Sequence, residues 1–154
     1  MKTIFLNTFL LCLFIGSVGC SSPTPSKEEL PENLTGYWKI HQVKEKGGDI
    51  RDYKVSTTVD YIEVKPDLTG FRRKLKPKLD STYEMTGNIE HFKINYATDS
   101  ITFTYKTDLD EWNERLISST KDEFTVKNNR GITYTYNRFE SLKKELEAHE
   151  KEVQ

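Results

Sequence analysis

Three kinds of side chain in this 154-residue sequence could bind or transform another molecule. Carboxylates gather in one short stretch, Asp108-Leu109-Asp110-Glu111, where they could coordinate a cation. That stretch lacks the glycine and the longer ligand series of a calcium loop, so we interpret it as a solvated turn. The histidines His41, His91 and His149 lie on three different predicted elements, without the spacing of a metal site. We therefore predict no metal site and no cofactor.

A run of basic residues, Phe71-Arg72-Arg73-Lys74-Leu75-Lys76-Pro77-Lys78, is the second candidate. Its five positive charges could form an anion-binding strip for anionic lipid headgroups, lipopolysaccharide or an acidic partner. The alternative is an edge strand or loop whose lysines prevent pairing with other chains. The run alternates poorly and contains a proline, which favours the alternative. The candidate strip consists of Arg72, Arg73, Lys74, Lys76 and Lys78.

Aromatic side chains supply the third candidate site. Alternation along the predicted strands turns several of them inward, and buried tyrosine hydroxyls need hydrogen-bond partners. A cavity lined in this way suits a small amphipathic molecule, but the same rings could equally fill the core. No Ser-His-Asp or Cys-His arrangement can be assembled, so we predict that the protein is not an enzyme. The candidate cavity residues are Phe92, Tyr96, Phe103, Tyr105, Tyr134 and Tyr136.

Strands must position these side chains, because period-two alternation runs from residue 35 to residue 138. Separators rich in Gly, Asp, Asn or Pro divide it into short segments. They number eight if 82–96 is one bent strand, and nine otherwise. The fold class predicted is all-β, an up-and-down antiparallel barrel. The predicted strands are 35–44, 57–65, 70–76, 82–86, 89–96, 100–106, 112–119, 123–128 and 131–138.

The period changes after residue 138 to that of a helix. Four apolar residues and one histidine recur at spacings of three or four, so they would lie on one face of a helix. We predict a C-terminal helix packed on the outside of the barrel, and a partner-binding helix is the alternative. The residues of this face are Phe139, Leu142, Leu146, His149 and Val153.

The first 19 residues have the features of a secretory signal peptide. Lys2 gives a positive start, and the apolar run from Ile4 to Val18 is shorter than the roughly 20 residues that span a bilayer. Its end, Val18-Gly19-Cys20, resembles the lipobox of bacterial lipoproteins. The resemblance implies that Cys20 is lipidated with acyl chains such as palmitate and anchors the protein to a membrane.

The segment 20–33 follows the signal and holds three of the five prolines. We predict a flexible tether here, and a single domain over 34–154. The other cysteine, Cys12, lies within the signal, so this domain has no disulfide. The net charge of −1 argues against nucleic-acid binding. We place the protein in the cell envelope, on the outer membrane of a Gram-negative bacterium, and predict no particular protein partner.

Barrel closure would bring the first and last strands together. Alternation turns Gly36 and Trp38 inward on the first strand, and Tyr136 and Arg138 inward on the last. If the two strands are neighbours, the Arg138 guanidinium meets the face of the Trp38 indole. Gly36 leaves room for this approach. We therefore assign Gly36, Trp38 and Arg138 to barrel closure.

These residues carry a resemblance to a known family. Gly36-Tyr37-Trp38 resembles the Gly-x-Trp that opens the first strand of lipocalins, and Arg138 resembles the arginine that ends their last strand. The stretch 34–139 is similar to the lipocalin-like domains of small bacterial lipoproteins. The resemblance implies an eight-stranded barrel that binds a small amphipathic or hydrophobic molecule without catalysis. The alternative is a protein-interaction or structural envelope module with a filled barrel core.

Overall fold

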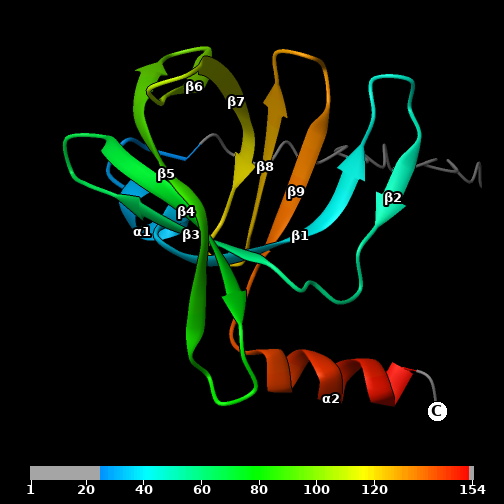
Figure 1. Cartoon of the computed structure of the whole chain (residues 1–154). Helices are drawn as coiled ribbons and strands as arrows, with labels where there is room; N and C mark the ends of the chain where they lie inside the picture. The colour runs from blue at the N-terminus through cyan, green and yellow to red at the C-terminus, as the bar shows by residue number, and fades with distance from the viewer. Residues whose placement is uncertain (1–24, 153–154) are drawn as a thin grey trace, which may run out of the picture.

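The computed structural model describes residues 25–152, so the predicted signal peptide and Cys20 lie outside the described residues. A short helix opens the chain, strands follow, and a longer helix ends it (Figure 1). The elements are α1 (Leu30–Leu34), β1 (Gly36–Lys44), β2 (Ile50–Asp52), β3 (Val59–Val64), β4 (Thr69–Pro77), β5 (Tyr83–Ala97), β6 (Ser100–Lys106), β7 (Glu111–Ser119), β8 (Glu123–Asn128), β9 (Thr133–Arg138) and α2 (Leu142–Glu152).

Eight of the strands form a closed antiparallel barrel. Their order is β1-β3-β4-β5-β6-β7-β8-β9, and β9 pairs back with β1. The predicted up-and-down all-β barrel is therefore confirmed, with 83–97 as one bent strand. The bend lies opposite a register shift between Arg73 and Leu75 of β4. Gly87 takes a φ of +76° there, a conformation that glycine adopts without a steric penalty.

β2 is an element that the sequence pattern does not predict. It has three residues and pairs only with the far end of β1, where Gln42 lies opposite Asp52. All three residues of β2 are exposed, so no alternation of buried and exposed positions marks the strand. The resulting hairpin extends beyond the barrel (Figure 1).

Regular secondary structure is already present before the predicted domain boundary at residue 34. Leu30–Leu34 form α1, and Pro31 stands in the first turn, where a missing N–H leaves no hydrogen bond unmade. The side chains of Leu30 and Leu34 are fully buried. Two leucines four residues apart are too short a pattern to predict a helix. α1 closes one end of the barrel, which we call the floor, and the opposite end is the mouth.

The interior next to the floor is filled. Trp38 packs edge-on against Phe124 at 4.7 Å between ring centroids, and Phe92 packs edge-on against Phe103 at 5.3 Å. Interiors packed in this way hold few voids larger than a water molecule. The buried residues of this cluster are Leu30, Leu34, Trp38, Ile62, Val64, Leu68, Phe92, Ile94, Ile101, Phe103, Tyr105, Leu116, Phe124, Val126 and Tyr136.

The first turn of α2 packs on the outside of the barrel, as the change of period predicts, but Leu146 of the predicted face is 38% exposed, and Val153 lies outside the described residues. Leu142 packs against a second buried cluster, which consists of Val59, Leu75 and Phe139. One ion pair adds to this contact, with 2.6 Å between Lys39 Nζ and Glu145 Oε1. Within residues 25–152, no helix has the length and apolar character needed to cross a membrane.

Candidate functional site

The first and last barrel strands meet at Trp38 and Arg138, which are paired in the β1–β9 register. The Arg138 guanidinium lies 3.9 Å from the centroid of the Trp38 ring. It also donates to three carbonyl oxygens: Nη1 to Thr35 at 2.6 Å, Nη2 to Asn33 at 2.9 Å, and Nε to Lys121 at 2.7 Å. Arg138 therefore joins the end of α1 and the β7–β8 turn to the last strand.

Gly36 and Trp38 complete this closure. Gly36 has a φ of +138°, and a Cβ atom there would lie 2.4 Å from Arg138 Nη1. The Trp38 indole N–H donates to the Leu34 carbonyl at 2.8 Å, which ties the first strand to the helix beneath it. All polar groups of the closure residues are thus engaged within the protein, and they perform structural work.

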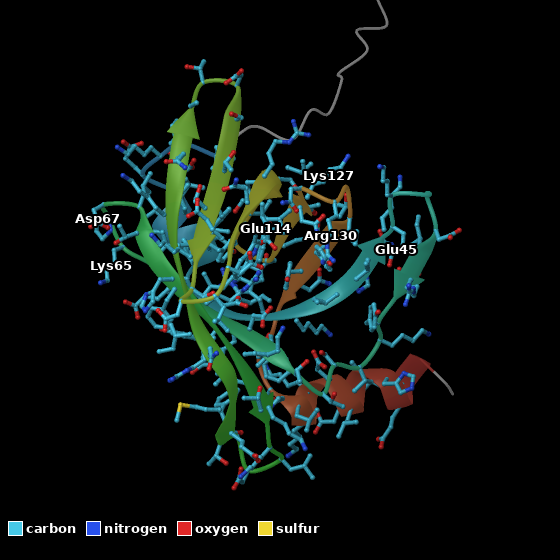
Figure 2. The ribbon with its side chains drawn as sticks, turned by 45° about the horizontal axis from the view of Figure 1, so that its top comes forward. Glu45, Lys65, Asp67, Glu114, Lys127 and Arg130 are labelled. Atoms are coloured by element: carbon cyan, nitrogen blue, oxygen red, sulfur yellow. The ribbon has the colours of Figure 1, made fainter. Side chains whose placement is uncertain are left out.

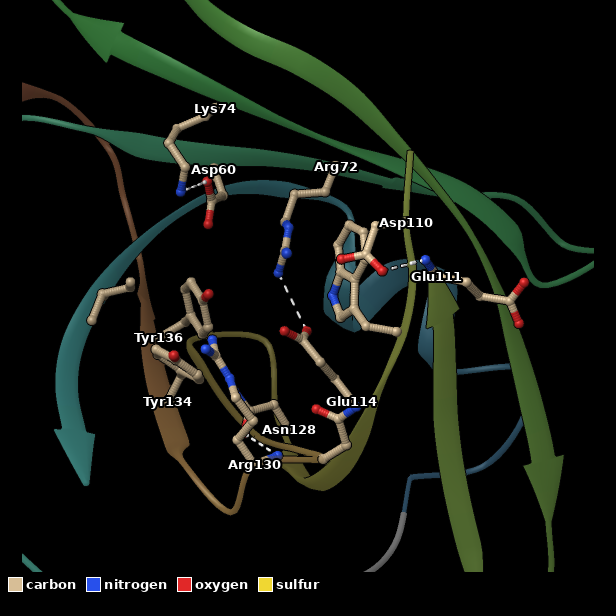
Figure 3. Close-up of a pocket in the computed structure, with 13 residues that line it drawn as sticks. Asp60, Arg72, Lys74, Asp110, Glu111, Glu114, Asn128, Arg130, Tyr134 and Tyr136 are labelled. Atoms are coloured by element: carbon tan, nitrogen blue, oxygen red, sulfur yellow. Dashed lines mark hydrogen bonds and ion pairs between the residues drawn. The ribbon is translucent and has the colours of Figure 1, made fainter. Parts of the chain in front are cut away.

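A cavity of about 580 Å³ lies at the mouth of the barrel (Figure 3). The half of the barrel next to the floor, which we call the floor half, is filled by the buried cluster. The volume of the cavity is within the range of small-molecule sites. Its walls mix charged, amide and aromatic side chains and include one aliphatic residue. The lining residues are Ile40, Asp60, Arg72, Lys74, Asp110, Glu111, Trp112, Glu114, Asn128, Asn129, Arg130, Tyr134 and Tyr136.

Arg72 occupies the inner end of the cavity. Its Nε donates to Glu90 Oε2 at 2.6 Å, and its Nη1 donates to Glu114 Oε2 at 3.3 Å. The guanidinium also lies over the ring of Tyr105 at 4.6 Å. Only 12% of the Arg72 side chain and 8% of the Glu114 side chain are exposed. Figure 2 shows Glu114 in the middle of the barrel, far from the charged turns at its surface.

Burial changes the titration of these groups. It raises the pKa of Glu114, while the neighbouring Arg72 acts in the opposite direction. Burial likewise raises the pKa of Tyr105 and of Tyr136 well above the ordinary tyrosine value. For Arg72, burial lowers the pKa, but the phenols and carboxylates around it outweigh that effect. The inner cavity therefore holds the Arg72–Glu114 contact beside two phenols that keep their protons at neutral pH.

A second ion pair stands nearer the rim. Asp60 is 4% exposed, and Lys74 Nζ lies 3.2 Å from its Oδ1. Asp60 and Lys74 face each other in the β3–β4 register, which explains the contact. Because the Lys74 side chain is 53% exposed, a ligand entering the mouth can meet this ammonium group directly.

The predicted aromatic residues divide between the cavity and the packed core. Tyr134 and Tyr136 line the cavity, and Tyr105 lies behind Arg72. Phe92 and Phe103 do not line it, because they pack against each other in the filled half. The number of inward rings could be predicted, but their height along the barrel axis could not.

Tyr96 is the one predicted cavity residue that lies outside the barrel interior. β5 runs past the floor, so its last inward position reaches the rim. Tyr96 is 39% exposed, and its hydroxyl donates to the Pro25 carbonyl at 3.2 Å. It serves the N-terminal segment and not the cavity.

The basic run does not form one continuous strip. β4 pairs with β3 on one side and β5 on the other, so it is not the edge strand of the alternative interpretation. Arg72 and Lys74 line the cavity, and alternation places Arg73 on the opposite face. Lys76 lies opposite Glu84, and Lys78 Nζ is 3.9 Å from Glu84 Oε2 on the hairpin beyond the barrel.

Sequence reasoning missed the buried carboxylates and Trp112. Asp60 and Glu114 occupy the inward positions next to the apolar Ile62 and Leu116 of their strands, and this break in the pattern was the available signal. The 108–111 turn is solvated, with Leu109 94% exposed, and it gives Asp110 and Glu111 to the cavity rim. Across the described part of the chain, no three His, Cys, Asp or Glu side chains gather as a metal site.

The arrangement of the strands decides the fold assignment. An eight-stranded up-and-down barrel is closed by its first and last strands, with Gly36, Trp38 and Arg138 at the join and a helix after the last strand. The fold is lipocalin-like in its strand order and closure. A shared fold does not identify a ligand, which depends on the residues that line the cavity.

Solved structures that are similar to this chain include two proteins from Bacteroides. A lipocalin-like protein from Bacteroides uniformis has a TM-score of 0.45 at 9% identity, over 69% of this chain and 98% of that one. An uncharacterized protein from Bacteroides eggerthii has a TM-score of 0.45 at 11% identity, over 70% of this chain and all (100%) of that one. No family model and no curated protein match the chain. The lipocalin-like assignment therefore rests on the barrel's own strand order and closure.

Proposed function

We propose that this lipocalin-like barrel binds a small amphipathic molecule in the mouth cavity, without catalysis, as a lipoprotein of the cell envelope. The observation that carries the binding proposal is the cavity of about 580 Å³ above a filled floor. A barrel of eight strands is just wide enough to hold one small ligand. The closure residues are fully used in the structure, so the mouth is where binding would occur.

The lining favours a compact ligand with polar groups over a long acyl chain. The floor half is packed with rings and aliphatic side chains, which leaves no space for a tail running the length of the barrel. Ile40 and the rings of Trp112 and Tyr134 offer apolar surface, and two ion pairs stand among them. A ligand that left these charges without water or a partner would bind poorly.

The proposal of binding without catalysis rests on how the carboxylates are engaged. Glu114 accepts from Arg72, and Asp60 accepts from Lys74. A neighbouring cation favours the charged form of a carboxylate and so reduces its basicity. Both candidate bases are held in such ion pairs.

The envelope location is supported by the sequence of the first 20 residues alone. A membrane-attached chain with the implied acyl chains would stay bound, because more than one lipid signal is enough for stable attachment. Substitution Cys20→Ala should abolish labelling of the protein by a radioactive fatty acid in cells. Continued labelling of the variant would refute the anchor.

The binding proposal can be tested with N-phenyl-1-naphthylamine, a neutral amphipathic dye that becomes fluorescent in apolar surroundings. Titration of the full chain should give saturable fluorescence at one site. Ile40→Trp should weaken the dye's affinity by about tenfold or more, because the larger ring fills the cavity.

Ile117→Trp is the matched control, since Ile117 is 49% exposed and does not line the mouth cavity. It should leave the affinity unchanged. A dye that binds Ile40→Trp as well as it binds the original chain must sit elsewhere. That result would favour the alternative of an interaction module whose barrel serves as a scaffold.

A further inference from the structure

We propose that the ligand of the mouth cavity carries an anionic group, such as a carboxylate, that binds to Arg130, Tyr134 and Tyr136. The inference rests on the proposed ligand-binding function and adds the chemical class of the ligand. It follows from an asymmetry within the lining. The inner cations already have carboxylate partners, whereas the donors of the β8–β9 hairpin that face the cavity have none among the described residues.

Arg130 is fixed at the rim by its turn. Asn128 Oδ1 accepts hydrogen bonds from the backbone N–H groups of Arg130 and Ile132, both at 3.0 Å. Gly131 has a φ of +85°, and its N–H donates to the Asn128 carbonyl at 3.0 Å. This hairpin turn leaves the Arg130 side chain directed along Tyr134 and Tyr136 into the cavity, as Figure 3 shows. Its backbone is thus preorganised while its guanidinium stays available.

The three cations of the lining differ in their partners. Arg72 is paired with Glu90 and Glu114, and Lys74 with Asp60. The Arg130 guanidinium makes no hydrogen bond or ion pair with any residue between 25 and 152. Arginine presents a planar fork of donors that matches a carboxylate in two parallel hydrogen bonds. An anionic ligand can therefore pair with Arg130 without breaking an ion pair that already exists in the cavity.

The two tyrosines beside Arg130 add further donors. Neither the Tyr134 nor the Tyr136 hydroxyl has a hydrogen-bond partner in the described part of the chain. The Tyr136 ring is held in place by stacking on Phe124, at 4.5 Å between centroids. Burial raises the pKa of Tyr136, so its hydroxyl keeps its proton and remains a donor. A guanidinium next to two free phenol donors is a site for an anion.

The carboxylates of the lining do not cancel this preference. Asp60 and Glu114 are neutralised by Lys74 and Arg72. Asp110 accepts the backbone N–H of Glu111 at 2.8 Å. Figure 3 shows the Glu111 side chain directed away from the cavity. The remaining negative charge thus lies on the β6–β7 side and the free positive charge on the β8–β9 side. This polarity would orient a bound anion toward Arg130.

Two dyes with the same ring system separate the anion from the apolar contact. 8-Anilino-1-naphthalenesulfonate carries a sulfonate, and N-phenyl-1-naphthylamine lacks it. With the full chain, we expect the anionic dye to bind more tightly than the neutral one. Arg130→Gln should weaken the anionic dye by about fivefold and leave the neutral dye unchanged. Tyr134→Phe should weaken the anionic dye by a smaller factor, since it removes one hydroxyl and keeps the ring.

Lys127→Gln is the control for net charge. Lys127 lies near Arg130 on the same hairpin (Figure 2), but it is exposed beside the buried Val126 and does not line the mouth cavity. It should leave both affinities unchanged. Equal weakening of the anionic dye by Lys127→Gln and Arg130→Gln, or no weakening by Arg130→Gln, would overturn the anion site alone. Failure of both dyes to bind the original chain would overturn the proposed binding function, and the anion site with it.

Discussion

The two halves of the barrel share the same strands, but the interior of the floor half is apolar and packed, and the interior of the mouth half is a cavity lined by charged side chains. On β7, Leu116 faces the packed floor, and Glu114 and Trp112 are the next inward residues toward the mouth. On β3, Ile62 belongs to the packed cluster, and Asp60 lines the cavity. On both strands a buried carboxylate thus directly follows the last inward residue of the packed cluster. The contrast teaches that the floor half provides stability, which allows the mouth half to carry groups that are costly to bury.

The largest expected effect concerns the two tryptophans. Trp38 is fully buried in the floor half, whereas Trp112 is half-buried at the mouth. Trp38→Ala should lower the free energy of unfolding by about 3–5 kcal/mol. Trp112→Ala should lower it by roughly 1 kcal/mol, because less apolar surface is lost. Denaturant titration of both variants measures the difference. Equal losses would mean that the mouth half carries as much of the stability as the floor half.

An intermediate effect is expected for the two arginines. Arg138→Ala removes a cation over the Trp38 ring and three donors to backbone carbonyls. We expect a loss of about 2 kcal/mol in the free energy of unfolding, and a lower Tm. Arg130→Ala should change stability by less than about 0.5 kcal/mol, because its guanidinium makes no hydrogen bond or ion pair to a residue within 25–152. Thermal unfolding gives the Tm of each variant, and we expect a clear decrease only for Arg138→Ala. An unchanged Tm for Arg138→Ala would contradict its role in barrel closure.

The smallest effect is a pH dependence that belongs to the mouth half. Burial raises the pKa of Glu114 above its ordinary value of 4.5, so the folded state holds this proton more tightly than the unfolded state. The contribution of Glu114 to stability is therefore greatest below pH 4.5 and declines as the pH rises through the folded-state pKa. Glu114→Gln should remove that decline, so the variant gains stability relative to the original chain on going from about pH 4 to about pH 7.

Denaturant titrations of the two chains across that range measure this relative gain. Glu111→Gln serves as the control, because Glu111 is an exposed carboxylate of the same strand. A stability difference between Glu114→Gln and the original chain that stays constant with pH would show that the buried carboxylate does not titrate as described.

The contrast between the halves also explains what the sequence could predict. Alternation over 35–138 was enough for the barrel, its strand order and the meeting of Trp38 with Arg138, because each depends on which face a residue occupies. Alternation says nothing of position along the barrel axis. Phe92 and Tyr134 share the inward direction, yet one is in the packed core and the other lines the cavity.

Two further features depend on contacts that local patterns do not encode. The pairing of Arg72 with Glu114 joins β4 to β7 across the interior, over 42 positions of sequence. α1 is stabilised by the floor residues it covers, since five residues are too few to form a helix alone in water. The Arg72–Glu114 pair and α1 both depend on how the strands are arranged around the barrel axis.

The position of α1 sets the direction in which the barrel faces. The Tyr96 hydroxyl holds the Pro25 carbonyl at the floor rim, while Asp110 and Arg130 mark the opposite end. The residues before Pro25 therefore join the barrel at its floor. A surface that holds the chain by that segment would have the cavity turned away from it, open to molecules arriving from the surrounding medium.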